Sequence, residues 1–238
     1  DNYLNNFKFQ LSGYEKELDC NIYLNQFSNK NSTFLDTLHF SLNSNKGNLQ
    51  YDLNWFYNDS LLYNGSISGE YVFQKDYNEL RFSKSKFYLA NKLWNITEQS
   101  VIRAKNNNFT LNNFSIESAN ERIDISGFYD KNLKIYFDFF NFDINLLNYF
   151  RKPDASKFVG RLDGSIWYSS VSKPFGGYFK IKDFTMNNVL LGEMILNAQS
   201  DFSRSSLFLN ADIKPYDTHK TLNLNGSISL EKNDIDFI

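Results

Sequence analysis

The sequence has little of several residue types that metal sites and disulfide-rich folds require. Its 238 residues include one cysteine, two histidines and three prolines. A single cysteine, Cys20, excludes an internal disulfide framework and the four-cysteine zinc modules. The histidines, His39 and His219, are far apart in sequence and show no metal-like spacing to Cys20 or to acidic pairs. We therefore expect no metal site and no catalytic histidine.

Strong net charge and long apolar runs are also missing. The formal net charge is −2, which gives no general attraction to nucleic acid or to an anionic surface. The longest apolar candidate, Val189–Leu196, is interrupted by Gly192 and Glu193 and falls short of the roughly 20 residues of a membrane helix. No phosphate-binding loop, nucleophile elbow or zinc-peptidase motif occurs. We expect a protein that is not an enzyme and that uses no cofactor.

Aromatic residues, in contrast, are abundant and regularly placed. Phe, Tyr and Trp make up 18% of the chain, with 24 Phe and 15 Tyr. Apolar residues alternate with polar ones over long stretches, for example Leu49–Tyr57, Ile123–Tyr129, Leu133–Phe139 and Leu207–Ile213. This period of two is typical of strands with one apolar face. The pattern predicts an all-β fold.

The spacing of these runs predicts about 14 to 17 strands joined by tight turns, such as Asp130-Lys131-Asn132, in an antiparallel meander. One segment differs, because Leu146, Leu147 and Phe150 have helical spacing after Asp143, a suitable N-cap. We therefore expect a first block of strands over 1–142, a short helical spacer over 143–152 and a second block over 153–238. Periodicity alone leaves a β-sandwich, a closed barrel and an open, curled groove as alternatives.

The order of several motifs resembles that of the TamB family, the translocation and assembly module proteins. AsmA-like proteins share this order of motifs. The motifs are Leu93-Trp94-Asn95-Ile96, the stretch 111–130 with Ile123-x-Ile125-x-Gly127, Phe142–Leu147, Gly160–Ile166, Gly177–Ile181 and Val189–Gly192. The resemblance is clearest over about residues 60–230.

The resemblance implies a specific architecture and role. Family members form an elongated, curled antiparallel sheet with a taco-like apolar groove, are anchored in the inner membrane and span the periplasm. The implied function is to carry phospholipid to the outer membrane, or to assist outer-membrane protein assembly with a TamA-like barrel partner. The chain begins at Asp1 without an initiator Met. We expect it to be a middle segment of such a groove, with phospholipid acyl chains as ligand and no nucleic-acid partner.

Residues on the apolar parity of successive strands are expected to line the groove. They are Leu53, Trp55, Ile67, Tyr71, Phe73, Ile116, Ile123, Ile125, Ile135, Phe137, Leu162, Ile166, Phe179, Ile181, Leu207, Leu209, Leu222, Leu224 and Ile228. The rival functions are a transmembrane β-barrel, whose strands alternate in the same way, and a carbohydrate-binding or adhesin β-sandwich. The latter needs exposed aromatic platforms, whereas Trp55, Trp94 and Trp167 are expected to point inward.

Overall fold

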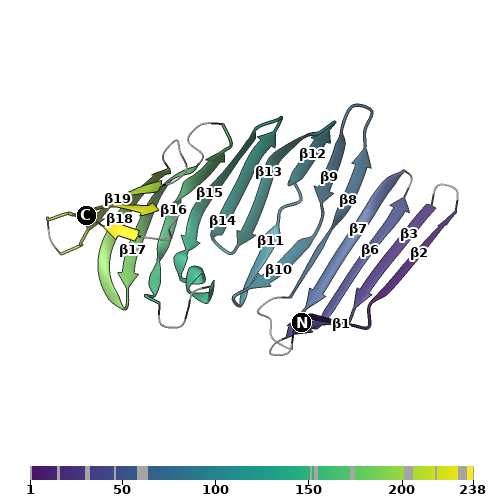
Figure 1. Ribbon diagram of the computed structural model, residues 1–238, viewed down its shortest axis with the longest axis horizontal. Helices are drawn as coiled ribbons and strands as arrows, with labels where there is room; N and C mark the ends of the chain where they lie inside the picture. Colours follow the sequence, from purple (N-terminus) through teal and green to yellow (C-terminus); the bar gives the residue numbers. More distant parts are fainter. Residues whose placement is uncertain are drawn as a thin grey trace. The chain divides into compact units, whose positions relative to one another are not determined.

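The chain folds almost entirely into antiparallel β-strands, which confirms the all-β prediction (Figure 1). The computed structural model describes residues 2–14, 17–29, 33–45, 47–57, 64–150, 152, 155–171, 175–200, 206–217, 219–229 and 235–237. Contacts divide the chain into two units, Asp1–Ser118 and Ala119–Ile238. Each unit is described by itself below.

The first unit is a meander of long strands with a small three-stranded sheet at its beginning. The small sheet comprises β1 (Asn2–Asn5), β4 (Gln26–Asn29) and β5 (Thr33–Leu35). The large sheet comprises β2 (Lys8–Tyr14), β3 (Glu17–Leu24), β6 (Thr37–Asn45), β7 (Asn48–Phe56), β8 (Gly65–Phe73), β9 (Asn78–Phe82), β10 (Ser85–Leu89), β11 (Lys92–Ile96), β12 (Val101–Lys105) and β13 (Asn108–Ser118).

The described parts of the chain contain 21 strands rather than the 14 to 17 expected, and two positions in the large sheet of this unit are each filled by two short strands. β9 and β10 together occupy the place of one strand beside β8, and β11 and β12 do the same beside β13. Buried serines satisfy the main chain at these breaks. The Ser85 hydroxyl accepts from the Ser68 N–H at 3.0 Å and donates to its carbonyl at 3.1 Å, while the Ser100 hydroxyl accepts from the Ser115 N–H at 3.1 Å. Polar side chains thus replace the ladder bonds that the breaks interrupt.

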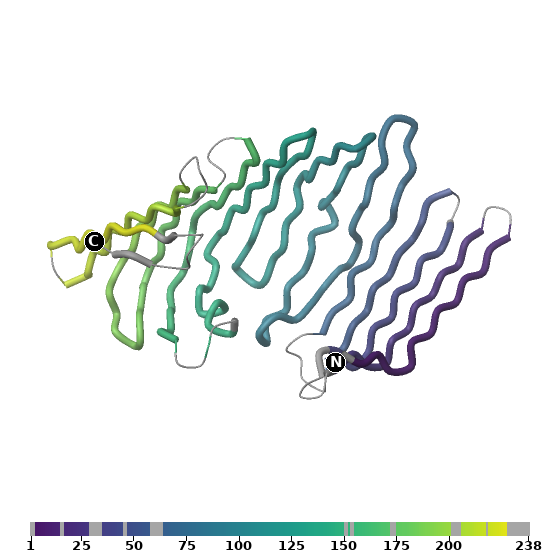
Figure 2. The backbone as a smooth tube through the Cα atoms, viewed as in Figure 1, coloured from purple at the N-terminus to yellow at the C-terminus, as the bar shows by residue number. Residues whose placement is uncertain are grey.

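The second unit is a meander that runs in chain order across one sheet. Its strands are β14 (Glu121–Tyr129), β15 (Leu133–Asp143), β16 (Phe158–Ser169), β17 (Phe175–Met186), β18 (Val189–Ser200), β19 (Ser206–Lys214), β20 (Leu222–Ser229) and β21 (Ile235–Phe237). The tube in Figure 2 follows these hairpins from teal through green to yellow. Short polar turns at 130–132 and 187–188 connect β14 to β15 and β17 to β18, as the sequence pattern predicts.

Bulges cross neighbouring strands of the second unit and bend them. The register shifts between β15 and β16, again between β16 and β17, and again between β17 and β18. Residues with positive φ lie at each shift, namely Asn141 (φ +50°), Gly160 (φ +151°), Asp183 (φ +53°) and Gly192 (φ +109°). A Cβ on Gly192 would lie 2.1 Å from the Lys214 carbonyl oxygen, so the main chains approach too closely for any side chain. Bulges strengthen local twist, and β17 and β18 curve visibly in Figure 1.

The predicted helix is present as a 3-10 turn, η1 (Ile144–Phe150), within the second unit. Asp143 caps it as expected, because its carboxylate accepts the Asn145 N–H at 3.0 Å. Ile144 and Leu146 are only 3% and 7% exposed and belong to a small core with Phe142. The division of the chain into groove blocks 1–142 and 153–238 stays a prediction.

No second layer covers most of the apolar surface in the described parts of the chain. The protein exposes 15474 Å² of surface. A compact protein of 27.9 kDa would expose about 11,000 Å², and even two separate compact halves would together expose about 13,400 Å². The excess exceeds about 2,000 Å². Single open sheets account for it, whereas face-to-face packing as a sandwich would remove it.

Candidate functional site: the apolar sheet faces

The apolar residues of the second unit form continuous rows across its strands. Paired residues of an antiparallel ladder point to the same face, so the register defines each row. The first row is Ile125, Phe137, Ile166, Gly177, Ala198, Leu209 and Gly226, and the second is Ile123, Phe139, Gly164, Phe179, Leu196, Ala211 and Leu224. Each row crosses seven strands without a charged residue. We call this surface the second apolar face.

Large and small residues face one another on the second apolar face. Ile166 lies opposite Gly177, and Leu209 lies between Ala198 and Gly226. Because a large side chain rests over a neighbour that has almost none, the sheet can curl without leaving deep holes. Both rows are therefore apolar along their length.

Thirteen of the predicted groove residues lie on this face, but they are not equally accessible. Ile125, Phe137 and Ile166 are half-buried, and Leu222 and Leu224 are 53% and 40% exposed. Five further residues on this face are also half-buried, namely Ile123, Ile135, Phe179, Leu207 and Leu209. The backbone register also places Ile228 on this face, although its side chain lies outside the described residues.

The prediction of an open lining is wrong for Leu162 and Ile181. They lie opposite each other on the correct face but are only 9% and 5% exposed. Register shifts occur beside both residues, and η1 packs against β16. These two side chains therefore belong to the small core around Phe142. The spacing of residues could not show this, because alternation reports the face of a strand and not what covers it.

The first unit has an apolar face of the same kind. Leu53 and Ile67 lie opposite each other, in a row that continues through Phe40 and Ile22 to Phe9. Phe9 is 54% exposed, and the others are half-buried. The predicted residues Trp55, Tyr71, Phe73 and Ile116 share the face with Leu53 and Ile67. We call this surface the first apolar face.

Aromatic side chains on the first apolar face lie over glycines. A Cβ on Gly65 would meet the Trp55 ring at 2.3 Å, and one on Gly69 would meet the Tyr51 hydroxyl at 2.5 Å. The Tyr51 hydroxyl donates to the Arg81 carbonyl at 3.1 Å, and burial raises the pKa of Tyr51 to about 12. Its polar tip is thus satisfied, and only its ring faces the apolar surface.

The expected inward orientation of the three tryptophans holds for two of them. Trp55 lies on the first apolar face, and Trp94 is 1% exposed. Trp167 is the exception, because it pairs with Tyr136 and Gly176 on the opposite, polar face. The sequence does carry a signal for this, because Trp167 lies between Ile166 and Tyr168, and alternation assigns those two residues to the apolar face.

The polar face of the first unit carries an ion-pair network that the sequence pattern did not indicate. The Glu79 side chain, 3% exposed, accepts from Arg103 Nε at 2.7 Å and from Arg81 Nη2 at 2.6 Å. Arg81 also pairs with Glu70 at 3.2 Å. The Arg103 hydrogen bond, followed by the contact with Arg81, holds the pKa of Glu79 below its ordinary value despite burial. The residues are on three strands, so the network ties β8, β9 and β12 together.

Metal-binding constellations do not occur in the part of the chain that the structure describes. It contains no group of three or more His, Cys, Asp and Glu side chains placed to hold a metal ion. None of its helical segments has the length and apolar character needed to cross a membrane. The two apolar faces are therefore the candidate site. No protein-family model, curated protein or solved structure matches the chain.

Proposed function

We propose that the second apolar face holds the acyl chains of phospholipid and lets them move along the sheet. The observation that carries the proposal is the pair of apolar rows, each seven strands long and only partly covered. Soluble proteins rarely leave a contiguous apolar patch of this kind exposed unless something binds to it.

The dimensions of the face suit an acyl chain. Strands lie about 4.8 Å apart, so seven strands span about 29 Å. One leaflet of a bilayer has about half of the roughly 30 Å of the hydrocarbon core, so a row is longer than one acyl chain. Each methylene removed from water contributes about 0.8 kcal/mol. Both rows mix large apolar side chains with glycine and alanine and contain no polar side chain that could hold a lipid at one position, which favours sliding over trapping.

The first apolar face is proposed to act in the same way. Together with the motif order, it supports a role as a groove segment of a TamB- or AsmA-like protein in the periplasm, with a TamA-like partner reached through other parts of a longer protein. Assistance to outer-membrane protein assembly is a second use of the same surface, since an unfolded outer-membrane strand also presents alternating apolar side chains.

Native mass spectrometry of the detergent-free chain, purified from bacterial cells, tests the proposal. We expect phospholipid masses on the wild-type chain and their loss in Phe137→Asp. The matched control is Tyr136→Asp, because Tyr136 is the adjacent residue, is 41% exposed and lies on the polar face. A lipid-free wild-type chain, or equal retention by both variants, would contradict the proposal.

A further inference from the structure

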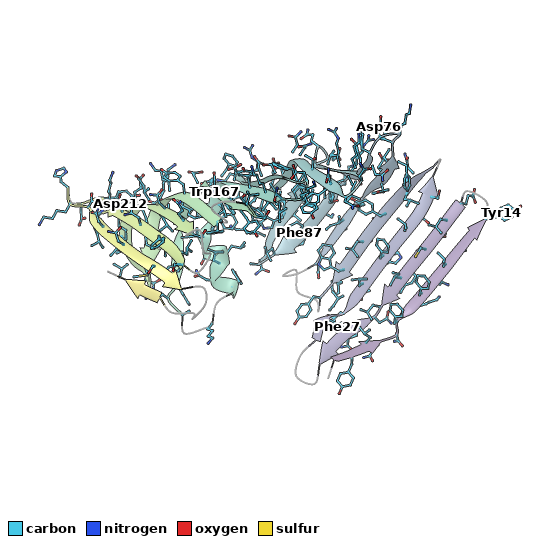
Figure 3. All side chains as sticks on the ribbon, turned by 45° about the horizontal axis from the view of Figure 1, so that its top comes forward. Tyr14, Phe27, Asp76, Phe87, Trp167 and Asp212 are labelled. Atoms are coloured by element: carbon cyan, nitrogen blue, oxygen red, sulfur yellow. The ribbon has the colours of Figure 1, made fainter. Side chains whose placement is uncertain are left out.

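Three aromatic side chains on the polar face of the second unit line one pocket and are not used by the lipid proposal. They are Trp167 on β16, Tyr178 on β17 and Phe208 on β19, and the last two are 45% and 55% exposed. Figure 3 shows Trp167 and Asp212 along the upper side of the second unit in that view. These aromatics point away from the second apolar face, so they do not contribute to the packing there.

The Trp167 indole lies flat on the sheet. It faces Gly176 across the ladder, and a Cβ on that glycine would meet the indole Cζ2 at 2.2 Å. The glycine therefore leaves room for the ring to rest on the main chain. The indole packs on the main chain at Gly176 and is half-buried, so part of its surface remains exposed.

Carboxamide side chains surround the aromatics. Asn197, Asn210 and Asn225 form one row across β18, β19 and β20, which begins at Tyr178, and Gln199 lies between Gly176 and Phe208 in the next row. The Asn197 and Gln199 side chains make no hydrogen bond with any residue that the structure describes. Each therefore offers a free donor and a free acceptor side by side.

The aromatics and carboxamides line one shallow pocket of about 510 Å³, and none of the described residues that line it is charged. Two neighbouring charged side chains, Lys180 and Asp212, already have partners. Lys180 pairs with Glu193 at 2.9 Å, and Asp212 accepts from the Asn223 amide at 2.9 Å. The pocket is thus neutral, flat and rich in paired donors and acceptors.

We infer that this pocket binds a neutral glycan chain. A pyranose ring presents a flat C–H face, which packs on an aromatic ring, and adjacent hydroxyls, which bond to one carboxamide in pairs. The strand spacing of about 4.8 Å is close to the length that one β-linked pyranose adds to an extended chain. Successive sugars would therefore meet successive strands from Trp167 toward Phe208. A nucleic acid would stack on the same rings but requires cationic side chains for its phosphates, and the described lining of this pocket contains none.

Isothermal titration of the full chain with chitotetraose and with cellotetraose tests the inference. We expect binding of at least one probe in the millimolar range or tighter, and the two arms distinguish N-acetylated from plain hexoses. Trp167→Ala should weaken binding by at least about tenfold. Trp167→Tyr, which keeps an aromatic face, should retain most of it, and Asn197→Ala should weaken it.

Trp55→Phe is the matched control, because Trp55 lies over a glycine in the same way but on an apolar face. It should leave glycan binding unchanged. Absence of heat with both probes, equal binding by wild type and Trp167→Ala, or preference for a polyanion such as heparin would each overturn the inference. Since the site is on the face opposite the proposed lipid surface, its failure would leave the lipid proposal intact.

Discussion

A pair of identical substitutions on one face distinguishes an open surface from a packed core. Ile166 and Ile181 both lie in the middle of strands and on the same apolar face, but Ile166 is half-buried and Ile181 is 5% exposed. Asp has the same poor strand propensity at both sites. The difference between Ile166→Asp and Ile181→Asp therefore reports what covers each side chain.

The expected magnitudes are well separated. At Ile181 the substitution loses about 2–3 kcal/mol of apolar burial, and a carboxyl group without a partner adds a cost of about 2 kcal/mol or more. The sum of about 4–6 kcal/mol is comparable with the whole stability of a domain. At Ile166 the carboxylate stays hydrated, and we expect a loss of about 1–2 kcal/mol.

Urea unfolding followed by far-ultraviolet circular dichroism measures both losses. With a slope of about 2 kcal/mol per molar urea, the midpoint should fall by about 2–3 M for Ile181→Asp and by less than about 1 M for Ile166→Asp. If the two variants lose equal stability, the face around Ile166 is sealed and the proposed lipid surface has no physical basis.

Three further predictions concern the scaffold. Glu79→Gln should lower stability at pH 7 by about 1–2 kcal/mol, because one carboxylate holds two partly exposed arginines. Since the folded pKa of Glu79 is lowered, its contribution is present above the unfolded value of about 4.3 and is lost as the pH falls; the variant should flatten the acid limb in urea titrations. Gly192→Ala should cost about 2–4 kcal/mol, against about 1 kcal/mol for Gly47→Ala, because Gly47 also has positive φ but has open space around it. If Gly192→Ala and Gly47→Ala lowered stability equally, contact with the main chain could not be the reason for the loss at Gly192. Protonated Tyr51 contributes its full stabilisation below the unfolded pKa of about 10. This contribution is lost as the pH rises through the folded pKa of about 12. Tyr51→Phe should therefore remove that part of the alkaline decline in thermal melts.

Alternation of apolar and polar residues predicted the strands and the face of nearly every apolar residue. The reason is local, since a strand side chain points to one face or the other and a slip of one residue would reverse a whole row. The short helix was also predictable, because Asp143 caps it through a contact two residues away.

Contacts between distant residues were not predictable in the same way. The bulges depend on close approaches such as that of Gly192 to Lys214, which lies on another strand. These bulges and η1 convert Leu162 and Ile181 from surface into core. Trp167 differs from its neighbours only by parity, and the glycan site that we infer there depends on carboxamides from three later strands.

Photo-crosslinking tests the central claim most directly. A photoreactive amino acid at Ile166, irradiated in bacterial cells, should capture phospholipid acyl chains, since its side chain lies on the uncovered part of the second apolar face. The same residue at Asp163 should capture none, because Asp163 is on the same strand but pairs with Lys180 on the polar face. Capture at both positions, or at neither, would contradict the account.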